Sequence, residues 1–168
     1  MKKTLSVTAF NESGVLTRIS TVFSSRGFNI DSIAVGPTET DGISRITIVL
    51  PANDELVLQA VKQLNKLVQI IHVKDVTNIP CVERELLLIQ VEASQKIRPE
   101  IIEIAQIFRA KIVDISDKSI MLEITGDPGK VVVIQELLKK YRILKIARTG
   151  KIVLERDAGI NTEYLKTL

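Results

Sequence analysis

Two patterns of hydrophobic and polar residues alternate along the first half of the chain. Alternation with a period of two is typical of a half-buried strand, and apolar residues three or four positions apart are typical of a helix face. The first pattern predicts strands at 5–10, 29–35, 44–50 and 67–76. The second predicts helices at 14–25 and from residue 54 onward. This order of elements is that of a ferredoxin-like βαββαβ unit.

The second half repeats the same order of elements. Strands are predicted at 86–91, 111–115, 120–125 and 143–147. One helix has an apolar face formed by Ile101, Ile104, Ala105 and Phe108. The other opens at Asp127, which suits an N-cap, followed by Pro128 at the first helical position, and it runs to about Tyr141. We therefore expect an α+β protein with two ferredoxin-like βαββαβ domains.

The boundary between the two repeats is expected in a short segment. Residues 78–83 contain Pro80, which is awkward inside a central strand, and we assign them as a linker. The domains are then 1–77 and 84–150, and residues 151–168 form a polar, loosely held C-terminal tail.

Composition supports buried cores and excludes several classes of protein. The chain has 168 residues, of which 45% are hydrophobic, and its formal net charge is only +3. The single cysteine, Cys81, excludes an intrachain disulfide and a multi-cysteine metal site. No apolar run is long enough to cross a bilayer, so no membrane partner is expected. Met1 leads into a strand without a signal or transit peptide, so we expect a cytoplasmic protein, or a plastid stroma protein if it is organelle-encoded.

The connection between the first strand and the first helix is the main candidate for a binding site. Such a turn directs free backbone N–H groups at whatever lies above it, and the helix dipole favours an anion there. Gly14 allows a ligand to approach the backbone, and Asn11 offers an amide with a donor and an acceptor. Residues 11–16 are therefore suited to the carboxylate of an amino acid.

The corresponding connections in the second half lack these features. Residues 93–99 contain neither Gly nor Asn, and the turn at 108–111 has no counterparts of Gly27 and Asn29. We therefore assign small-molecule sensing to the first domain, and interaction or assembly to the second.

Local structure offers alternative interpretations of some of these residues. Asn11 and Gly14 also suit a helix N-cap and a tight turn, and residues 26–27 also suit a helix stop. Residues 126–130 match a phosphate loop only in part, because no Ser or Thr follows the lysine, and helix capping explains them better.

Two other classes of function find little support in the sequence. RNA-recognition domains share the βαββαβ order but carry aromatic residues on their central strands for base stacking. The corresponding residues here, 46–49 and 120–123, include none, so no nucleic-acid partner is expected. Neither half gathers His, Cys or paired acids, and His72 has no neighbouring ligand, so we expect neither a catalytic nor a metal site.

Several segments together carry a family resemblance. They are 5–7, 11–18, 23–30, 37–38, 44–48, 62–68, 82–86 and 147–150. In them the first half resembles an ACT domain, a small-molecule-sensing βαββαβ module. The whole chain resembles the small regulatory subunits of acetohydroxyacid synthase, also called acetolactate synthase. The resemblance extends over nearly all of the chain in one register and is weaker at 93–95 and from Arg156 onward.

The resemblance implies a regulatory chain without catalysis or cofactors of its own. Its partner would be a catalytic large subunit that uses thiamine diphosphate, Mg²⁺ and usually FAD to condense pyruvate with a second 2-oxo acid. The small subunit raises this activity and lets the end product of branched-chain amino-acid biosynthesis, usually valine, suppress it. Leucine and isoleucine remain open as effectors, because an aliphatic pocket separates them from valine by only about 1–3 kcal/mol per methylene.

The resemblance also implies a homodimer through the ACT domain, with the effector between two chains. The effector-binding residues would be Asn11, Ser13, Gly14, Val15 and Leu16 of one chain, which face Asn29 and Ile30 of its neighbour. The alternative is a free-standing amino-acid-sensing regulator of another enzyme or of a transport system.

Overall fold

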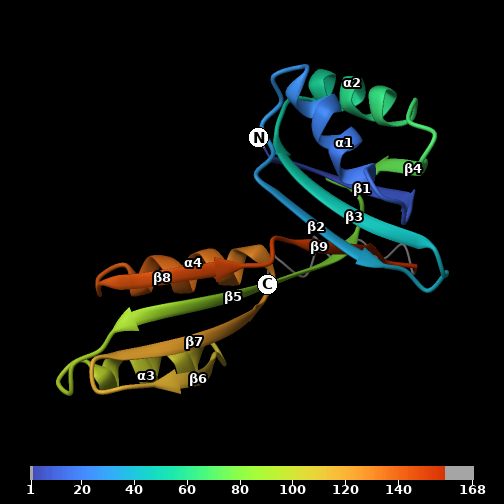
Figure 1. Cartoon of the computed structure of the whole chain (residues 1–168). Coiled ribbons are helices and arrows are strands. Elements are labelled where there is room, and N and C mark those ends of the chain that lie inside the picture. The colour runs from blue at the N-terminus through green and yellow to red at the C-terminus, as the bar shows by residue number, and fades with distance from the viewer. Residues whose placement is uncertain (1, 158–168) are drawn as a thin grey trace. The chain divides into compact units, whose positions relative to one another are not determined.

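The computed structural model describes residues 2–157, which form two compact units. Unit 1 comprises residues 2–82 together with 152–157, and unit 2 comprises residues 83–151. Each unit combines a pair of helices with an antiparallel sheet (Figure 1).

Unit 1 has the βαββαβ order, and its sheet has the strand order β2-β3-β1-β4. Every pair of neighbouring strands in this sheet is antiparallel. The ferredoxin-like fold predicted for the first half is therefore confirmed. The elements are β1 (Lys2–Phe10), α1 (Val15–Ser24), β2 (Ser32–Pro37), β3 (Ile43–Pro51), α2 (Asp54–Leu64) and β4 (Ile70–Asp75).

The core of unit 1 lies between its sheet and its two helices, which cover the same face of the sheet (Figure 1). Alternate residues of β1 point to this face and are fully buried. Leu5 pairs with Ile48 of β3, and Val7 pairs with Ile46. Helix α1 contributes Phe23 to the same cluster. Burial of each such side chain stabilises the fold by about 1.5–3 kcal/mol.

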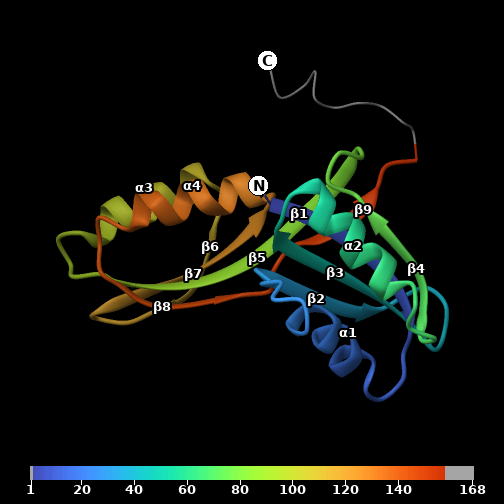
Figure 2. The ribbon, with the colours of Figure 1, turned by 90° about the horizontal axis from the view of Figure 1, so that it is seen from above.

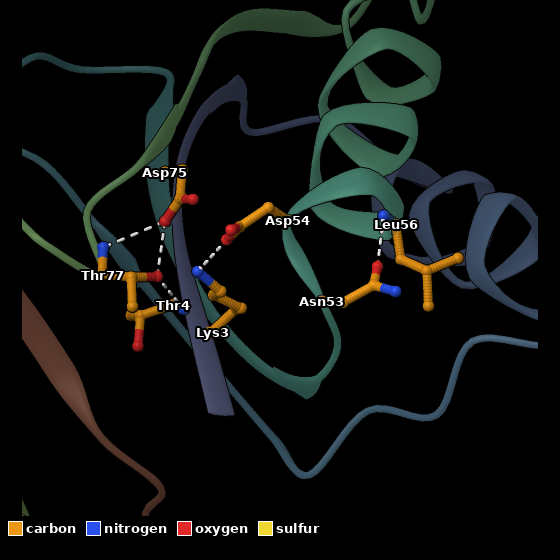
Figure 3. A network of polar contacts seen from close by, with 7 residues as sticks. All are labelled: Lys3, Thr4, Asn53, Asp54, Leu56, Asp75 and Thr77. Carbon is orange, nitrogen blue, oxygen red and sulfur yellow. Dashed lines mark hydrogen bonds and ion pairs between the residues drawn. The ribbon is translucent and has the colours of Figure 1, made fainter. Parts of the chain in front are cut away.

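A polar network joins the start of β1, the start of α2 and the end of β4 (Figure 3). Lys3 lies on β1 with only 2% of its side chain exposed, and its Nζ pairs with Asp54 in the first turn of α2. This hydrogen bond raises the pKa of Lys3 above its usual 10.5, against the opposite effect of burial, so the ammonium is charged at neutral pH. Beside it, Asp75 accepts hydrogen bonds from the N–H and the hydroxyl of Thr77, whose oxygen accepts from the N–H of Thr4.

Unit 2 repeats the βαββαβ order, with the strand order β6-β7-β5-β8. Both of its helices lie on one face of this sheet (Figure 2), and their apolar residues form the core with that face. The second ferredoxin-like unit is therefore confirmed as well. The elements are β5 (Cys81–Glu92), α3 (Arg98–Ile107), β6 (Lys111–Ile115), β7 (Ser119–Gly126), α4 (Pro128–Leu138) and β8 (Ile143–Arg148).

The segment between the two repeats is more regular than the sequence predicts. Strand β5 begins at Cys81 and not at Leu86, so residues 78–83, predicted as a linker, contain the first residues of a strand. A further strand, β9 (Ile152–Glu155), pairs with β5 and supplies partners for its backbone.

The predicted tail therefore also needs correction. Its first part contains β9, and after this strand the Arg156 N–H donates to the carbonyl of Pro80 at 2.9 Å. The four residues of β9 are too few to produce a clear period-two pattern in the sequence. The remaining residues of the tail, 158–168, lie outside the described residues.

Candidate functional site

Backbone contacts hold the turn between β1 and α1. The Asn11 N–H donates to the carbonyl of Gly42 at 2.8 Å, and the Glu12 N–H donates to the carbonyl of Phe10 at 3.0 Å. Gly14 is the N-cap residue of α1 and has a φ of +85°, a left-handed conformation that glycine adopts at little cost. A Cβ added to Gly14 would meet nothing within 4 Å, so the backbone conformation, and not crowding, requires a glycine here.

The first turn of α1 is uncapped, unlike those of two other helices. Among the described residues, no side chain caps α1. By contrast, Asn53 accepts from a backbone N–H of α2 at 2.9 Å (Figure 3), and Asp127 accepts from one of α4 at 3.0 Å. The interpretation of Asn11 as a helix cap is therefore wrong, and that of Gly14 as a turn residue is confirmed. The Val15 N–H donates to the carbonyl of Glu12 at 3.4 Å, whereas the N–H groups of Leu16 and Thr17 have no acceptor among the described residues and remain available to an anion.

The turn borders a shallow hollow of about 150 Å³ on the surface of unit 1. This hollow lies between the end of β1, the first turn of α1, and strands β2 and β3. Four of the residues singled out in the sequence line it: Asn11, Gly14, Val15 and Leu16.

Sequence reasoning missed the rest of the lining, most of which comes from neighbouring elements. These residues are Phe10, Thr17, Val35, Ser44 and Ile46, whereas Glu12 lies within the segment 11–16 that the sequence singled out. Val35 of β2 pairs with Ile46 of β3, and Ser44 pairs with Ala9 of β1. The strand register therefore brings Val35, Ser44 and Ile46 to the hollow, and no local pattern in the sequence specifies that register.

The lining of the hollow combines apolar and charged groups. Phe10, Leu16 and Val35 are apolar side chains that are about half exposed, which is unusual for such residues close to a core. Beside them lie the carboxylate of Glu12 and the uncapped N-terminus of α1. This arrangement suits a small molecule that has an aliphatic part and charged groups.

Three of the predicted site residues lie elsewhere. Ser13, Asn29 and Ile30 are not part of the lining. Asn29 and Ile30 follow the other end of α1, a helix of 10 residues that spans about 15 Å. Asn29 is exposed, and Ile30 packs partly against the core. The structure therefore does not bring Asn29 and Ile30 to the turn within one chain.

Helix α1 ends at a Schellman motif centred on Gly27, whose φ is +68°. The Phe28 N–H donates to the carbonyl of Phe23 at 2.9 Å, and the Gly27 N–H donates to that of Ser24 at 3.1 Å. The rings of Phe23 and Phe28 meet edge to face, with centroids 5.9 Å apart. The interpretation of residues 26–27 as a helix stop is confirmed.

Strand β2 is an edge strand of the sheet of unit 1. Within residues 2–157 its outer side has no pairing strand, and its apolar residues Ile33 and Val35 are exposed. Such an edge can pair with a strand of another chain. Because Val35 also lines the hollow, a chain that pairs with β2 would come close to it.

Residues 126–130 form the start of α4 and not a phosphate loop. Asp127 caps the helix, and the Lys130 Nζ donates to the carbonyl of Thr125 at 2.9 Å. The prediction of helix capping is confirmed. Across residues 2–157, no group of three or more His, Cys, Asp or Glu side chains is placed to hold a metal ion, and no helix combines the length and apolar character needed to span a membrane.

Comparison with known proteins covers both units. Residues 84–157 match the family model for the small subunit of acetolactate synthase. Residues 5–72 match the model for the ACT domain of proteins like the acetohydroxyacid synthase (AHAS) small subunit. A crystal structure of an acetolactate synthase small subunit from Thermotoga maritima superposes with a TM-score of 0.84 and 37% identity, over 93% of this chain and 98% of that chain.

Individual relatives agree with the family models. A probable acetolactate synthase small subunit of Archaeoglobus fulgidus is 48% identical over 93% of this chain and 98% of its own length. The acetolactate synthase small subunit of Bacillus subtilis is 44% identical over 100% of this chain and 98% of its own length. The chain spans only 34% of the length of the chloroplastic small subunit 2 of Arabidopsis thaliana, to which it is 45% identical. By these matches over both units, the chain belongs to the family of acetolactate synthase small subunits.

Proposed function

We propose that this chain is the regulatory subunit of an acetolactate synthase and binds a branched-chain amino acid, with valine as the first candidate, at the β1–α1 turn of unit 1. The observation that carries this proposal is the uncapped N-terminus of α1 beside a partly apolar hollow. In this family of small subunits, an amino acid bound at this turn would act as the regulator of a larger enzyme.

The carboxylate of the effector is held by the start of α1. Its first-turn N–H groups and the positive end of the helix dipole favour an anion, and hydrogen bonds to a charged group are stronger than neutral ones. Gly14 presents no Cβ to the ligand, and the Asn11 side chain adds a donor at the edge of the hollow.

The other two parts of the effector have partners in the same place. The aliphatic side chain lies against Leu16, Val35 and Ile46, which belong to the apolar part of the lining. The ammonium pairs with the Glu12 carboxylate or with backbone carbonyl oxygens of the turn.

A second copy of the chain completes the site. Asn29 and Ile30 do not reach the turn of their own chain, whereas a homodimer formed at the exposed edge of β2 allows the neighbour to supply them. An effector bound between two chains favours the dimer arrangements that close around it. It therefore shifts the population of states that the catalytic subunit meets.

Catalysis belongs to a large subunit in this proposal. That partner uses thiamine diphosphate, Mg²⁺ and FAD, and this chain raises its activity and confers feedback inhibition by valine, in the cytoplasm or the plastid stroma. A free-standing regulator of another enzyme is the second candidate. It predicts that the chain elutes without a thiamine-diphosphate-dependent partner and leaves the rate of that partner unchanged.

The test is a valine titration of the enzyme reconstituted from both subunits. Asn11→Ala and Gly14→Asp should keep the activation of the large subunit and reduce inhibition by valine about tenfold or more, because each removes or blocks a contact with the carboxylate. Asn65→Ala, at the exposed C-cap of α2, is the matched control and should be inhibited like the wild type. Unchanged inhibition in both site variants would refute the proposed site.

A further inference from the structure

Arg98, the first residue of α3, bridges two loops of unit 2. Its Nη2 donates to the carbonyl of Ser116 at 2.6 Å and to that of Ala93 at 3.3 Å. Ala93 directly follows β5, and Ser116 directly follows β6. One guanidinium therefore joins the β5–α3 connection to the β6–β7 turn.

The hydrogen-bond pattern shows that these loops are the counterparts of the loops at the hollow of unit 1. The Ala93 N–H donates to the carbonyl of Lys118 at 2.8 Å, as the Asn11 N–H donates to that of Gly42 at 2.8 Å. Each donor directly follows the first strand of its unit, and each acceptor directly precedes the third.

The two units differ at the residue that opens the first helix. Unit 2 has Arg98 there, and unit 1 has Val15, a buried apolar residue that lines the hollow. In unit 1 the turn is therefore open to a ligand. In unit 2, by contrast, the Arg98 guanidinium donates hydrogen bonds to carbonyl groups of the corresponding loops.

The placement of Arg98 is unfavourable in two respects. A cation near the N-terminus of a helix opposes the helix dipole. Its Nε atom is also buried without a hydrogen-bond partner among the described residues, which costs free energy. The two carbonyl contacts must offset both costs, and the planar guanidinium is well suited to bridging separate acceptors.

We infer that Arg98 is an internal clamp of unit 2. Its side chain occupies the place that corresponds to the ligand-accessible turn of unit 1. The clamp keeps the β5–α3 connection closed at all times and makes unit 2 unresponsive to small molecules. Removal of the side chain uncovers two carbonyl acceptors, which a small planar cation such as guanidinium can then occupy. The clamp belongs to unit 2 alone, so its test requires no effector and does not depend on the function proposed for unit 1.

Amide hydrogen exchange of the full chain, followed by NMR, measures whether the clamp is closed. The reporters are the N–H group of Ala93, which donates to the carbonyl of Lys118 across the two loops, and that of Ser116, which donates to the carbonyl of Ser119 within the β6–β7 turn. Arg98→Met keeps most of the apolar stem and removes the guanidinium, so it should fold and speed up exchange at both reporters about tenfold. Lys96→Met, an exposed lysine of the same loop, is the matched control and should leave both rates unchanged.

Arg98→Ala tests whether a free cation can replace the side chain. Addition of about 50 mM guanidinium chloride, far below unfolding concentrations, should slow exchange at the two reporters toward the wild-type rate. The same concentration of sodium chloride should not, and Arg98→Met, which fills the space, should not respond either. Wild-type exchange rates in Arg98→Met would overturn the clamp. A lack of rescue in a folded Arg98→Ala protein would overturn the inference that unit 2 keeps an occupied binding place.

Discussion

At the scale of single residues, a left-handed position ends the first helix of each unit, but the residue type differs. Gly27 ends α1 with a φ of +68°, and Arg109 ends α3 with a φ of +51°. In both, the next N–H donates to a carbonyl in the last turns of the helix, at 2.9 and 2.8 Å. A residue with a side chain costs about 1–2 kcal/mol in this conformation, so Arg109 carries strain that Gly27 avoids.

Arg109→Gly should therefore raise the free energy of unfolding by up to about 1 kcal/mol, because the relief of strain exceeds the extra backbone entropy of glycine. Gly27→Ala should lower it by about 1 kcal/mol. Urea unfolding measures both changes. Glu103→Gly, at an exposed position inside α3, is the control and should lower stability by about 1 kcal/mol. A loss of stability in Arg109→Gly similar to that of the control would show that Arg109 is not strained.

The pKa of Glu100 depends on two neighbouring side chains. The Tyr141 hydroxyl donates to Glu100 Oε2 at 2.7 Å, and the Lys140 Nζ lies 3.4 Å from the same oxygen. The hydrogen bond from Tyr141, followed by that from Lys140, lowers the pKa of Glu100 below its usual 4.5. A carboxyl group with a lowered pKa stabilises the fold above pH 4.5, and this contribution is lost as the pH falls through the lowered value.

Tyr141→Phe should move the pKa of Glu100 back toward 4.5, because it removes the strongest of these contacts. Tyr141→Phe should also lower the free energy of unfolding. The part of this loss that depends on Glu100 should have its full size at neutral pH and disappear in acid. An NMR titration of the Glu100 carboxyl carbon measures the pKa, and unfolding at several pH values measures the stability. In a Glu100→Gln background, Tyr141→Phe should have the same effect from about pH 3 to pH 7. A pH dependence that persists in that background would assign the effect to another group.

At the scale of elements, an ion pair and one buried side chain help to hold the short strand β9 in place. Its Glu155 pairs with Lys74 of β4 at 2.5 Å. Along the strand, Val153 is only 4% exposed, whereas its neighbour Ile152 is 57% exposed. One buried side chain therefore supplies most of the apolar burial of this element.

Val153→Ala should lower the free energy of unfolding by about 2 kcal/mol, because it removes two buried methyl groups and leaves a cavity. Ile152→Ala, on the exposed side of the same strand, should change it by less than about 0.5 kcal/mol. Thermal or urea unfolding of the pair measures the difference. Equal effects of the two substitutions would mean that β9 does not hold its place through Val153.

At the scale of the whole molecule, two units with one topology carry different edge strands. Ile33 on β2 and Ile112 on β6 have similar exposures, 38% and 42%, and pair with the buried residues Ile48 and Leu122 of the next strand. Only β2 lies beside the hollow. The proposed dimer uses the edge of β2, so a charged residue at position 33 should weaken dimerisation and one at position 112 should not.

Ile33→Lys should shift the chain toward the monomer, because a lysine on an edge strand opposes pairing with a second chain. Ile112→Lys, at the matched position of unit 2, should leave the oligomeric state unchanged. Analytical ultracentrifugation at several concentrations measures the association. If both variants associate like the wild type, β2 is not the dimer edge.

Local patterns were sufficient for most of the fold. The predicted helix at 14–25 is α1, and the predicted strand at 111–115 coincides with β6, because periodicity and turn residues act between neighbours in the chain. Strand β9 escaped prediction because four residues carry too weak a pattern, and its place depends on pairing with β5. The contributions of Val35 and Ser44 to the hollow also escaped prediction, because they follow from strand register.

By itself, the sequence determined the duplicated βαββαβ order, the turn at Gly14 and the asymmetry between the two halves. All three depend on residue type and on the spacing of residues that are close together in the chain. Only the tertiary structure decided that the first turn of α1 is uncapped, that strands β2 and β3 line the hollow beside it, and that Arg98 closes the corresponding loops of unit 2. Those features depend on contacts between residues far apart in the chain, and only a specific register and packing bring such residues together.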